Sequence, residues 1–81
     1  MNNIKQLERL LKYYKENITG TFKGVFSHKT LNINIYYIFR HNKFKGNEFL
    51  SFYYEIGNSK YEKDFKTLKD FVKFFENLGG I

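Results

Sequence analysis

The chain contains no cysteine, proline, tryptophan or alanine. The absence of cysteine excludes disulfide bonds and thiolate metal sites. No apolar run approaches the roughly 18–20 residues that a membrane-spanning helix requires. The N-terminal segment carries charges throughout an amphipathic pattern, so it does not resemble the short apolar core of a secretory signal. We therefore expect the protein to act in the cytoplasm.

Phenylalanine and tyrosine dominate the apolar residues, with ten and seven copies. A chain of 81 residues predicts one domain, residues 1–81, with little sequence to spare. Such a domain buries only about 60–65% of the surface that its unfolded chain exposes, so its core has to be dense. Aromatic side chains meet this need, because each can bury roughly 150–250 Å².

The net charge of +6 has two interpretations. A basic domain is typical of nucleic-acid binding. The high content of lysine, asparagine, isoleucine, phenylalanine and tyrosine is also favoured by AT-rich coding DNA, so part of the charge can follow from codon bias. That bias predicts a low-GC bacterium, or one of its phages, as the source, and it leaves the activity open.

Hydrophobic periodicity predicts two helices and three or four strands. The predicted elements are a helix at 3–17, strands at 21–27, 30–41, 47–56 and, optionally, 60–65, and a helix that begins at Thr67 and ends at Gly79. Asn2 or Asn3 can cap the first helix. Thr67 can cap the second, with Asp70 three residues later. The apolar stripe of the first helix consists of Ile4, Leu7, Leu11, Tyr14 and Ile18, widened by Leu10.

The element order α-β-β-β-(β)-α predicts the α+β class. Strands joined by short turns pair antiparallel, and two amphipathic helices need an apolar surface to cover. We therefore expect an antiparallel sheet with both helices packed on one face. The side chains expected on the helix-covered face are Phe22, Phe26, Leu31, Ile33, Ile35, Tyr37, Phe39, Leu50, Phe52, Tyr54 and Ile56.

The opposite face of the predicted sheet mixes polar and apolar side chains. Its apolar members would form a patch of about a few hundred Å², a size that often marks a contact site. We predict a partner-binding surface there, because aromatic residues and arginine dominate binding hot spots. Two alternatives stay open: ordinary cross-strand pairs on a wet face, and a homodimer. The predicted partner-binding residues are Tyr36, Ile38, Arg40, Phe49 and Tyr53.

Candidate catalytic and metal-binding residues are few. His28 and His41 fall at opposite ends of the second predicted strand, roughly 40 Å apart, so they cannot share a metal ion. Glu62, Asp64 and Asp70 gather near the start of the last helix, but lysines alternate with them and capping explains Asp70. We interpret the histidines as loop residues and the carboxylates as a solvated surface. We therefore expect no enzyme, and no catalytic, cofactor or metal site.

Basic residues support an alternative function. Lys5, Arg9 and Lys12 recur at i, i+4 and i+7 along one side of the first helix. Lys66 and Lys69 lie at the start of the last helix. Such clusters could contact the phosphates of RNA or DNA, with an affinity that falls steeply as salt rises.

The element order resembles that of the double-stranded-RNA-binding domain, which is α-β-β-β-α. That family contacts RNA with its first helix, with a histidine-bearing loop after its first strand, and with the basic start of its last helix. Here His28 occupies that loop, basic residues line the first helix, and the sequence GNSKYEK precedes the last helix. The family's run of adjacent lysines is absent. The resemblance implies nucleic-acid binding through these basic residues.

A short, cysteine-free chain of this composition and element order is also similar to small phage-encoded inhibitors, including anti-CRISPR proteins of Cas9-type effectors. That resemblance implies a non-enzymatic binding protein that inhibits a host protein or nucleoprotein machine by occluding a surface. The partner is then a host protein or nucleoprotein complex, met in the cytoplasm of the host cell. The alternative is a small basic nucleic-acid-binding protein.

Overall fold

A computed structural model describes residues 3–80 as two helices and four strands. The elements are α1 (Asn3–Glu16), β1 (Thr19–Ser27), β2 (Asn34–Phe44), β3 (Asn47–Ile56), β4 (Ser59–Phe65) and α2 (Leu68–Gly79). The strands form one antiparallel sheet in the order β1-β2-β3-β4. The predicted α+β class and element order are confirmed, and the fourth strand forms. This is one strand more than the order of the double-stranded-RNA-binding domain contains.

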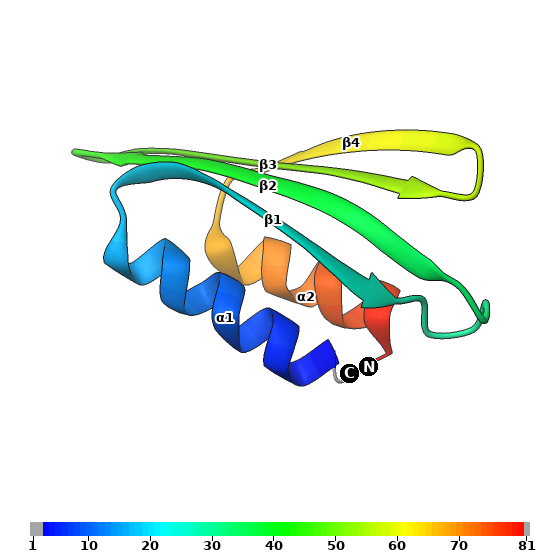
Figure 1. Cartoon of the computed structure of the whole chain (residues 1–81). Coiled ribbons are helices and arrows are strands. Elements are labelled where there is room, and N and C mark those ends of the chain that lie inside the picture. The colour runs from blue at the N-terminus through cyan, green and yellow to red at the C-terminus, as the bar shows by residue number, and fades with distance from the viewer. Residues whose placement is uncertain (1–2, 81) are drawn as a thin grey trace.

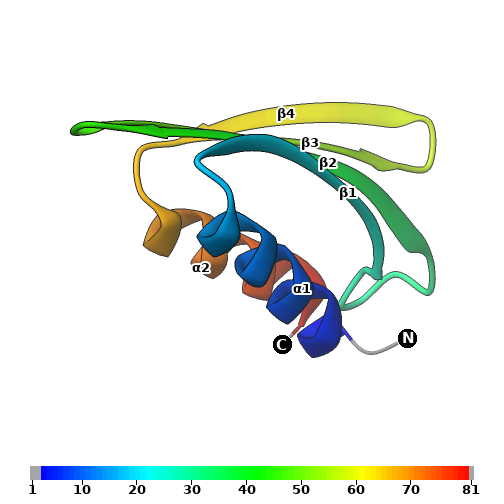
Figure 2. The ribbon, with the colours of Figure 1, turned by 60° about the vertical axis from the view of Figure 1, so that its left-hand side comes forward.

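Both helices pack against the same face of the sheet, as predicted (Figure 1). They run side by side in opposite directions, which the rotated view in Figure 2 also shows. Nδ2 of Asn3, at the start of α1, donates hydrogen bonds of 2.7 Å to the Gly79 carbonyl oxygen and 2.9 Å to the Ser27 carbonyl oxygen. Asn3 is thus a helical residue that ties both helices to β1, and Asn2 lies outside the described residues.

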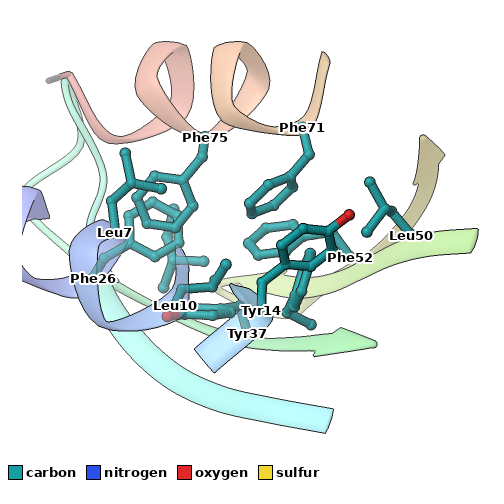
Figure 3. Close-up of a cluster of buried hydrophobic side chains, with 11 residues drawn as sticks. Leu7, Leu10, Tyr14, Phe26, Tyr37, Leu50, Phe52, Phe71 and Phe75 are labelled. Atoms are coloured by element: carbon teal, nitrogen blue, oxygen red, sulfur yellow. The ribbon is translucent and has the colours of Figure 1, made fainter. Parts of the chain in front are cut away.

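Aromatic rings fill the space between the helices and the sheet (Figure 3). The Phe26 and Phe75 rings stack with their centroids 4.4 Å apart, and the Tyr37 and Phe52 rings stack at 5.1 Å. Phe71 of α2 lies 5.2 Å from Phe52. All five side chains are fully buried. Because protein cores are packed as densely as organic crystals, this cluster fixes the helices rigidly to one face of the sheet.

Tyr37 carries the buried polar group at the centre of this core. Its hydroxyl accepts a 3.2 Å hydrogen bond from Nε2 of Gln6 on α1. Burial raises the pKa of Tyr37 well above its usual value, an effect that the nearby Arg9 guanidinium partly opposes. A Cβ atom added at Gly24 of β1 would sit 2.5 Å from the Tyr37 hydroxyl oxygen. The absence of a side chain at Gly24 therefore leaves space for the Gln6 side chain of α1 to reach the Tyr37 hydroxyl.

Two-residue turns join β2 to β3 and β3 to β4. Lys45 and Gly46 connect β2 to β3, and both have positive φ, 32° and 79°. Positive φ at both central residues is the signature of a type I′ turn, whose twist matches that of the flanking strands. Gly57, with φ of 60°, leads the turn between β3 and β4, as in type II′.

The ends of α2 are formed as predicted. Oγ1 of Thr67 accepts a 3.2 Å hydrogen bond from the Asp70 amide, which confirms the N-cap. The ring of Phe65, at the end of β4, packs on Phe71 with centroids 5.6 Å apart. Gly80 adopts the left-handed conformation and ends the helix.

The start of β2 differs from the prediction. The strand begins at Asn34, four residues later than expected. Nδ1 of His28 accepts hydrogen bonds from the amides of Thr30 and Leu31, at 3.1 and 3.0 Å, and holds this segment in a loop. Leu31 and Ile33 therefore leave the sheet. Their exposed fractions are 47% and 39%, so placing them on the helix-covered face was wrong.

The apolar stripe of α1 also differs from the prediction. The helix ends at Glu16, and Nδ2 of Asn17 donates a 2.7 Å hydrogen bond to the Tyr13 carbonyl oxygen. Ile18 lies beyond the helix and is 65% exposed, and Ile4 in its first turn is 52% exposed. Including these two residues in the buried stripe was wrong. The buried residues of α1 are Leu7, Leu10 and Tyr14.

Candidate functional site

The face of the sheet opposite the helices, here called the outer face, is covered by no segment within residues 3–80 (Figures 1 and 2). Side chains alternate between the two faces along a strand, so the strand register fixes which residues share the outer face. Two neighbouring rows cross the whole sheet. One row is Val25, Tyr36, Glu55 and Lys60, and the next is Lys23, Ile38, Tyr53 and Glu62.

Four apolar side chains in these rows, Val25, Tyr36, Ile38 and Tyr53, form a strip from β1 to β3 that we call the diagonal patch. Val25 lies opposite Tyr36, and Ile38 lies opposite Tyr53, in pairs whose Cβ atoms are about 4.5–5.5 Å apart. Tyr36 and Ile38 are neighbours on one face of β2 and join the two pairs. Tyr36 is 40% exposed, and the other three are half-buried. The structure thus brings together three of the five predicted partner-binding residues.

Arg40 and Phe49, the other two predicted partner-binding residues, share the outer face but lie outside the diagonal patch. Arg40 follows Ile38 along β2 and lies opposite Ser51, so it borders the patch. Phe49 lies opposite Asn42, closer to the β2–β3 turn, and is 51% exposed. Phe49 therefore belongs to a second apolar cluster.

That second cluster surrounds an open hollow of about 540 Å³ at the turn end of β2 and β3, here called the hairpin hollow. Phe44 and Ile18 line it with Phe49, and both are 65% exposed. The three side chains expose on the order of 300 Å² of apolar surface, a size typical of contact sites. Neither Ile18 nor Phe44 was predicted to bind a partner, because Ile18 continues the helical stripe of α1 and Phe44 falls between two predicted strands. The lining residues are Ile18, Thr19, Asn42, Phe44, Asn47, Glu48 and Phe49.

Charges on the outer face of the four strands are balanced. The cations are Lys23, Arg40 and Lys60, and the anions are Glu55, Glu62 and Asp64. The excess positive charge of the chain therefore lies on its other surfaces. Ser51, between Arg40 and Asp64, is buried, and its Oγ donates a 3.2 Å hydrogen bond to Oε1 of Glu62.

The five basic residues of the nucleic-acid alternative are exposed, but they do not form one cluster. Lys5, Arg9 and Lys12 follow α1 from its first turn, whereas Lys66 and Lys69 lie at the start of α2. The two helices run in opposite directions, so Lys5 lies at the other end of the helix layer from Lys66. A helix of this length spans roughly 20 Å. A phosphate backbone would have to cross the helix layer to meet all five.

Lys43 has a structural role. It lies in β2 rather than in the predicted turn. Its Nζ sits over the Tyr14 ring, 4.1 Å from the centroid, and donates to the Tyr14 carbonyl oxygen near the end of α1. A cation at a helix C-terminus satisfies unpaired carbonyl groups and complements the helix dipole.

His41 is buried in β2 with an exposed fraction of 3%, so interpreting it as a loop residue was wrong. Its ring lies 5.8, 5.0 and 5.6 Å from the rings of Tyr13, Tyr14 and Phe39. Neither ring nitrogen has a hydrogen-bond partner among the described residues. Burial lowers the pKa of His41, and the Lys43 ammonium lowers it further. Its alternation with Phe39 along β2 was the signal that could have placed it in the core.

Acidic side chains and histidines do not converge. Across residues 3–80, no three of them are arranged to hold a metal ion. Glu62 and Asp64 lie on the outer face of β4, whereas Asp70 lies in the first turn of α2. His28 is engaged within its own loop.

Comparison with known protein families, characterised proteins and solved structures found no match to this chain. No helix in the described part of the chain is both long and apolar enough to cross a bilayer. The outer face is therefore interpreted from its own geometry.

Proposed function

We propose that the chain is a non-enzymatic binding protein that acts by occluding a surface on a protein or nucleoprotein partner. The observation that carries this proposal is the diagonal patch, an apolar strip on a rigid sheet face that the described chain leaves uncovered. The strip is anchored from behind, because Phe39 and Phe52, next to Ile38 and Tyr53 in sequence, are fully buried in the aromatic core. A preordered surface of this kind loses little conformational freedom on binding.

The balanced charge of the outer face favours a protein surface over a phosphate backbone. Binding to nucleic acid is dominated by lysine and arginine contacts to phosphates. On this face three anions offset three cations, and Lys60 lies directly opposite Glu55. A mixed rim around an apolar centre is typical of protein–protein interfaces. Arg40, at the border of the patch, is the residue type most often enriched there.

The outer side of β2 links the two apolar clusters. Tyr36 in the diagonal patch and Phe44 in the hairpin hollow are eight residues apart on the same face of one strand. At about 3.4 Å per residue this is roughly 27 Å. A partner that lies along β2 can therefore fill both clusters, in an area comparable to the roughly 800 Å² that each side of a standard interface buries.

The composition supports a phage or mobile-element origin and action in the cytoplasm of a bacterial host, as an inhibitor of anti-CRISPR type. The partner in this proposal is a host machine, either a protein or a nucleoprotein complex. Its surface would present apolar residues to the diagonal patch. Loss of the machine's activity would follow from steric occlusion, without chemistry by the inhibitor.

The proposal is tested by capturing the partner in a low-GC bacterial host and reconstituting the complex from purified components. Titration calorimetry then compares the wild type with the double variant Tyr36→Ser, Tyr53→Ser. We expect a loss of affinity of about 10–100-fold, because central aromatic residues dominate interface energies. The partner's activity should recover in parallel. Circular dichroism checks that the variant is folded.

The matched control is the double variant Lys12→Ser, Lys69→Ser on the helix side. Under this proposal it binds the partner as the wild type does. If the lysine variant loses binding in a steeply salt-dependent way while the tyrosine variant binds normally, the proposal is wrong and nucleic-acid binding through the helices takes its place.

A further inference from the structure

The two edge strands of the sheet, β1 and β4, differ in whether other segments form hydrogen bonds with the backbone groups on their open edges. Tyr13 of α1 accepts a 3.1 Å hydrogen bond from the Thr21 amide on the open edge of β1. Oδ1 of Asn3 accepts from the Ser27 amide at 3.0 Å, and Nδ2 of the same side chain donates to the Ser27 carbonyl oxygen. Side chains of α1 thus occupy backbone groups at two points along the β1 edge.

The open edge of β4 receives no such hydrogen bond from any segment within residues 3–80. A two-residue turn joins β3 to β4, so the closing pair Ile56 and Ser59 is hydrogen-bonded, and every second pair after it is too. Backbone groups of the residues between these pairs point away from β3. Lys60, Glu62 and Asp64 therefore present their N–H and C=O groups at the open edge. An unpaired edge of this kind is a template for another strand.

We propose that β4 pairs antiparallel with β4 of a second copy of this chain, about a two-fold axis at Tyr61. A two-fold axis makes the contact reciprocal, so each strand must complement itself. With the axis at Tyr61, Lys60 of each copy lies opposite Glu62 of the other. Both pairs bring opposite charges together on the outer face. These are also the positions whose backbone groups are free to complete the ladder.

Charge excludes every other register that is centred on one of residues 60–64. Backbone pairing on this edge requires an axis that passes through one residue of β4. An axis at Lys60, Glu62, Lys63 or Asp64 places that charged residue against its own copy. Directly opposed like charges destabilise a strand pair. Among positions 60–64 only Tyr61 gives a register without a like-charge pair.

Aromatic stacking supports the same axis. The Tyr61 ring stacks on Tyr54 of β3 with centroids 5.1 Å apart and planes 18° from parallel. Tyr61 is still 45% exposed. At the axis the two Tyr61 residues form a non-hydrogen-bonded pair, the type in which side chains approach most closely. The result is a row of four tyrosines, two from each copy, on the helix side of the joined sheet.

The dimer joins two four-stranded sheets into one. Because the axis is perpendicular to the sheet, the helices of both copies lie on one side and both outer faces lie on the other. Two diagonal patches then face the same direction. The dimer does not depend on the proposed function of the outer face, but it would let one assembly engage two partner surfaces.

The test is sedimentation of the full chain from micromolar to millimolar concentration. We expect the mass to rise from 9.8 kDa toward twice that value in the wild type. Glu62→Lys should abolish the rise, because it places lysine opposite lysine twice. The charge swap Lys60→Glu, Glu62→Lys, made together with Glu55→Lys so that position 60 still lies opposite an unlike charge on β3, should restore it, because the pairs between the copies become complementary again. Both variants with Glu62→Lys lose the hydrogen bond that Ser51 donates to Glu62. If the swap still dimerises, the loss of dimer in Glu62→Lys alone is due to charge and not to a folding defect.

Glu16→Lys is the matched control, since it makes the same charge change at an exposed position at the end of α1 and should dimerise normally. A wild type that stays monomeric at millimolar concentration would overturn the inference. So would a dimer that survives Glu62→Lys but is lost with Tyr36→Ser, which would place the contact on the outer face. Neither outcome affects the test of partner binding, which uses the tyrosines of the diagonal patch.

Discussion

Ile38 and Tyr53 lie directly opposite each other on the outer face, and the next pair along the same two strands, Phe39 and Phe52, is fully buried. Consecutive pairs of β2 and β3 therefore lie on opposite faces of the sheet, one in the core and one on the surface. The core pair is covered by Phe71 of α2, whose ring lies 4.8 Å from Phe39 and 5.2 Å from Phe52. The surface pair is covered by no described segment of the chain.

The two pairs should differ sharply in their contribution to stability. Phe52→Ala should lower the free energy of unfolding by about 3–5 kcal/mol, because it removes a buried ring and leaves a cavity. Tyr53→Ser should lower it by about 1 kcal/mol or less, the scale of a surface cross-strand pair. Urea denaturation measures both values. A cost for Tyr53→Ser as large as that for Phe52→Ala would mean that Tyr53 is a core residue.

His41 should make the fold sensitive to acid. The pKa of His41 is lowered in the folded chain from its ordinary 6.5, first by burial and then by Lys43. Below pH 6.5 the unfolded chain therefore binds a proton that the folded chain excludes. The contribution of His41 to the free energy of unfolding should be constant above that pH and fall as the pH drops toward the pKa of the folded state.

His41→Phe is the control for this effect. Phenylalanine keeps the packing against Tyr13 and Tyr14, and it removes two ring nitrogens that have no partner in the described chain. Stability of the variant should change less between about pH 7 and 5 than that of the wild type. Parallel pH curves for the two proteins would show that His41 is not the group responsible.

Gly24→Ala should destabilise the fold by about 1–3 kcal/mol, the cost of overpacking a core. The added Cβ would meet Oη of Tyr37 and, closer still, Nε2 of Gln6. In a Gln6→Ala background one of these two clashes is gone, so the same substitution should cost less. Equal costs in both backgrounds, measured by urea denaturation, would contradict the packing seen at this point.

Lys45→Asn should stabilise the β2–β3 turn. Lys45 has φ of 32°, a conformation that asparagine tolerates better than other side chains, and Gly46 already supplies the second positive φ. A gain of about 0.5 kcal/mol would raise the melting temperature by roughly 2–4 °C in a domain of this size. Lys45→Ala removes the same charge without the conformational benefit, so it should give no gain. Equal shifts in both variants would point to charge instead.

Local patterns were sufficient to predict most of the fold. In α2 the apolar residues recur with the helical period, and in β2 and β3 they alternate with a period of two. In each element this places most of the aromatic residues on one face, which could be assigned to the core. Errors arose where a tertiary or side-chain interaction replaced the local pattern. Leu31 and Ile33 continue the alternation of β2, but the His28 imidazole holds them in a loop.

The candidate site was predictable only in part, for the same reason. Tyr36, Ile38 and Tyr53 could be assigned to one face from alternation alone. Ile18 and Phe44 could not be joined to Phe49 from the sequence, because the hairpin hollow depends on where α1 ends and where the β2–β3 turn lies. The backbone groups on the open edge of β4 could not be identified from the sequence either, because they depend on the register between β3 and β4, and β4 was only an optional strand in the prediction.

Hydroxyl-radical footprinting of the partner complex maps contacts on the unmodified chain, so it shows whether the partner covers the outer face. We expect strong protection of Tyr36, Tyr53 and Phe49 when the partner is bound, and no change on the helix side at Leu11 or Val72. Protection confined to the helix side, with Tyr36 and Tyr53 labelled as in the free protein, would contradict this proposal.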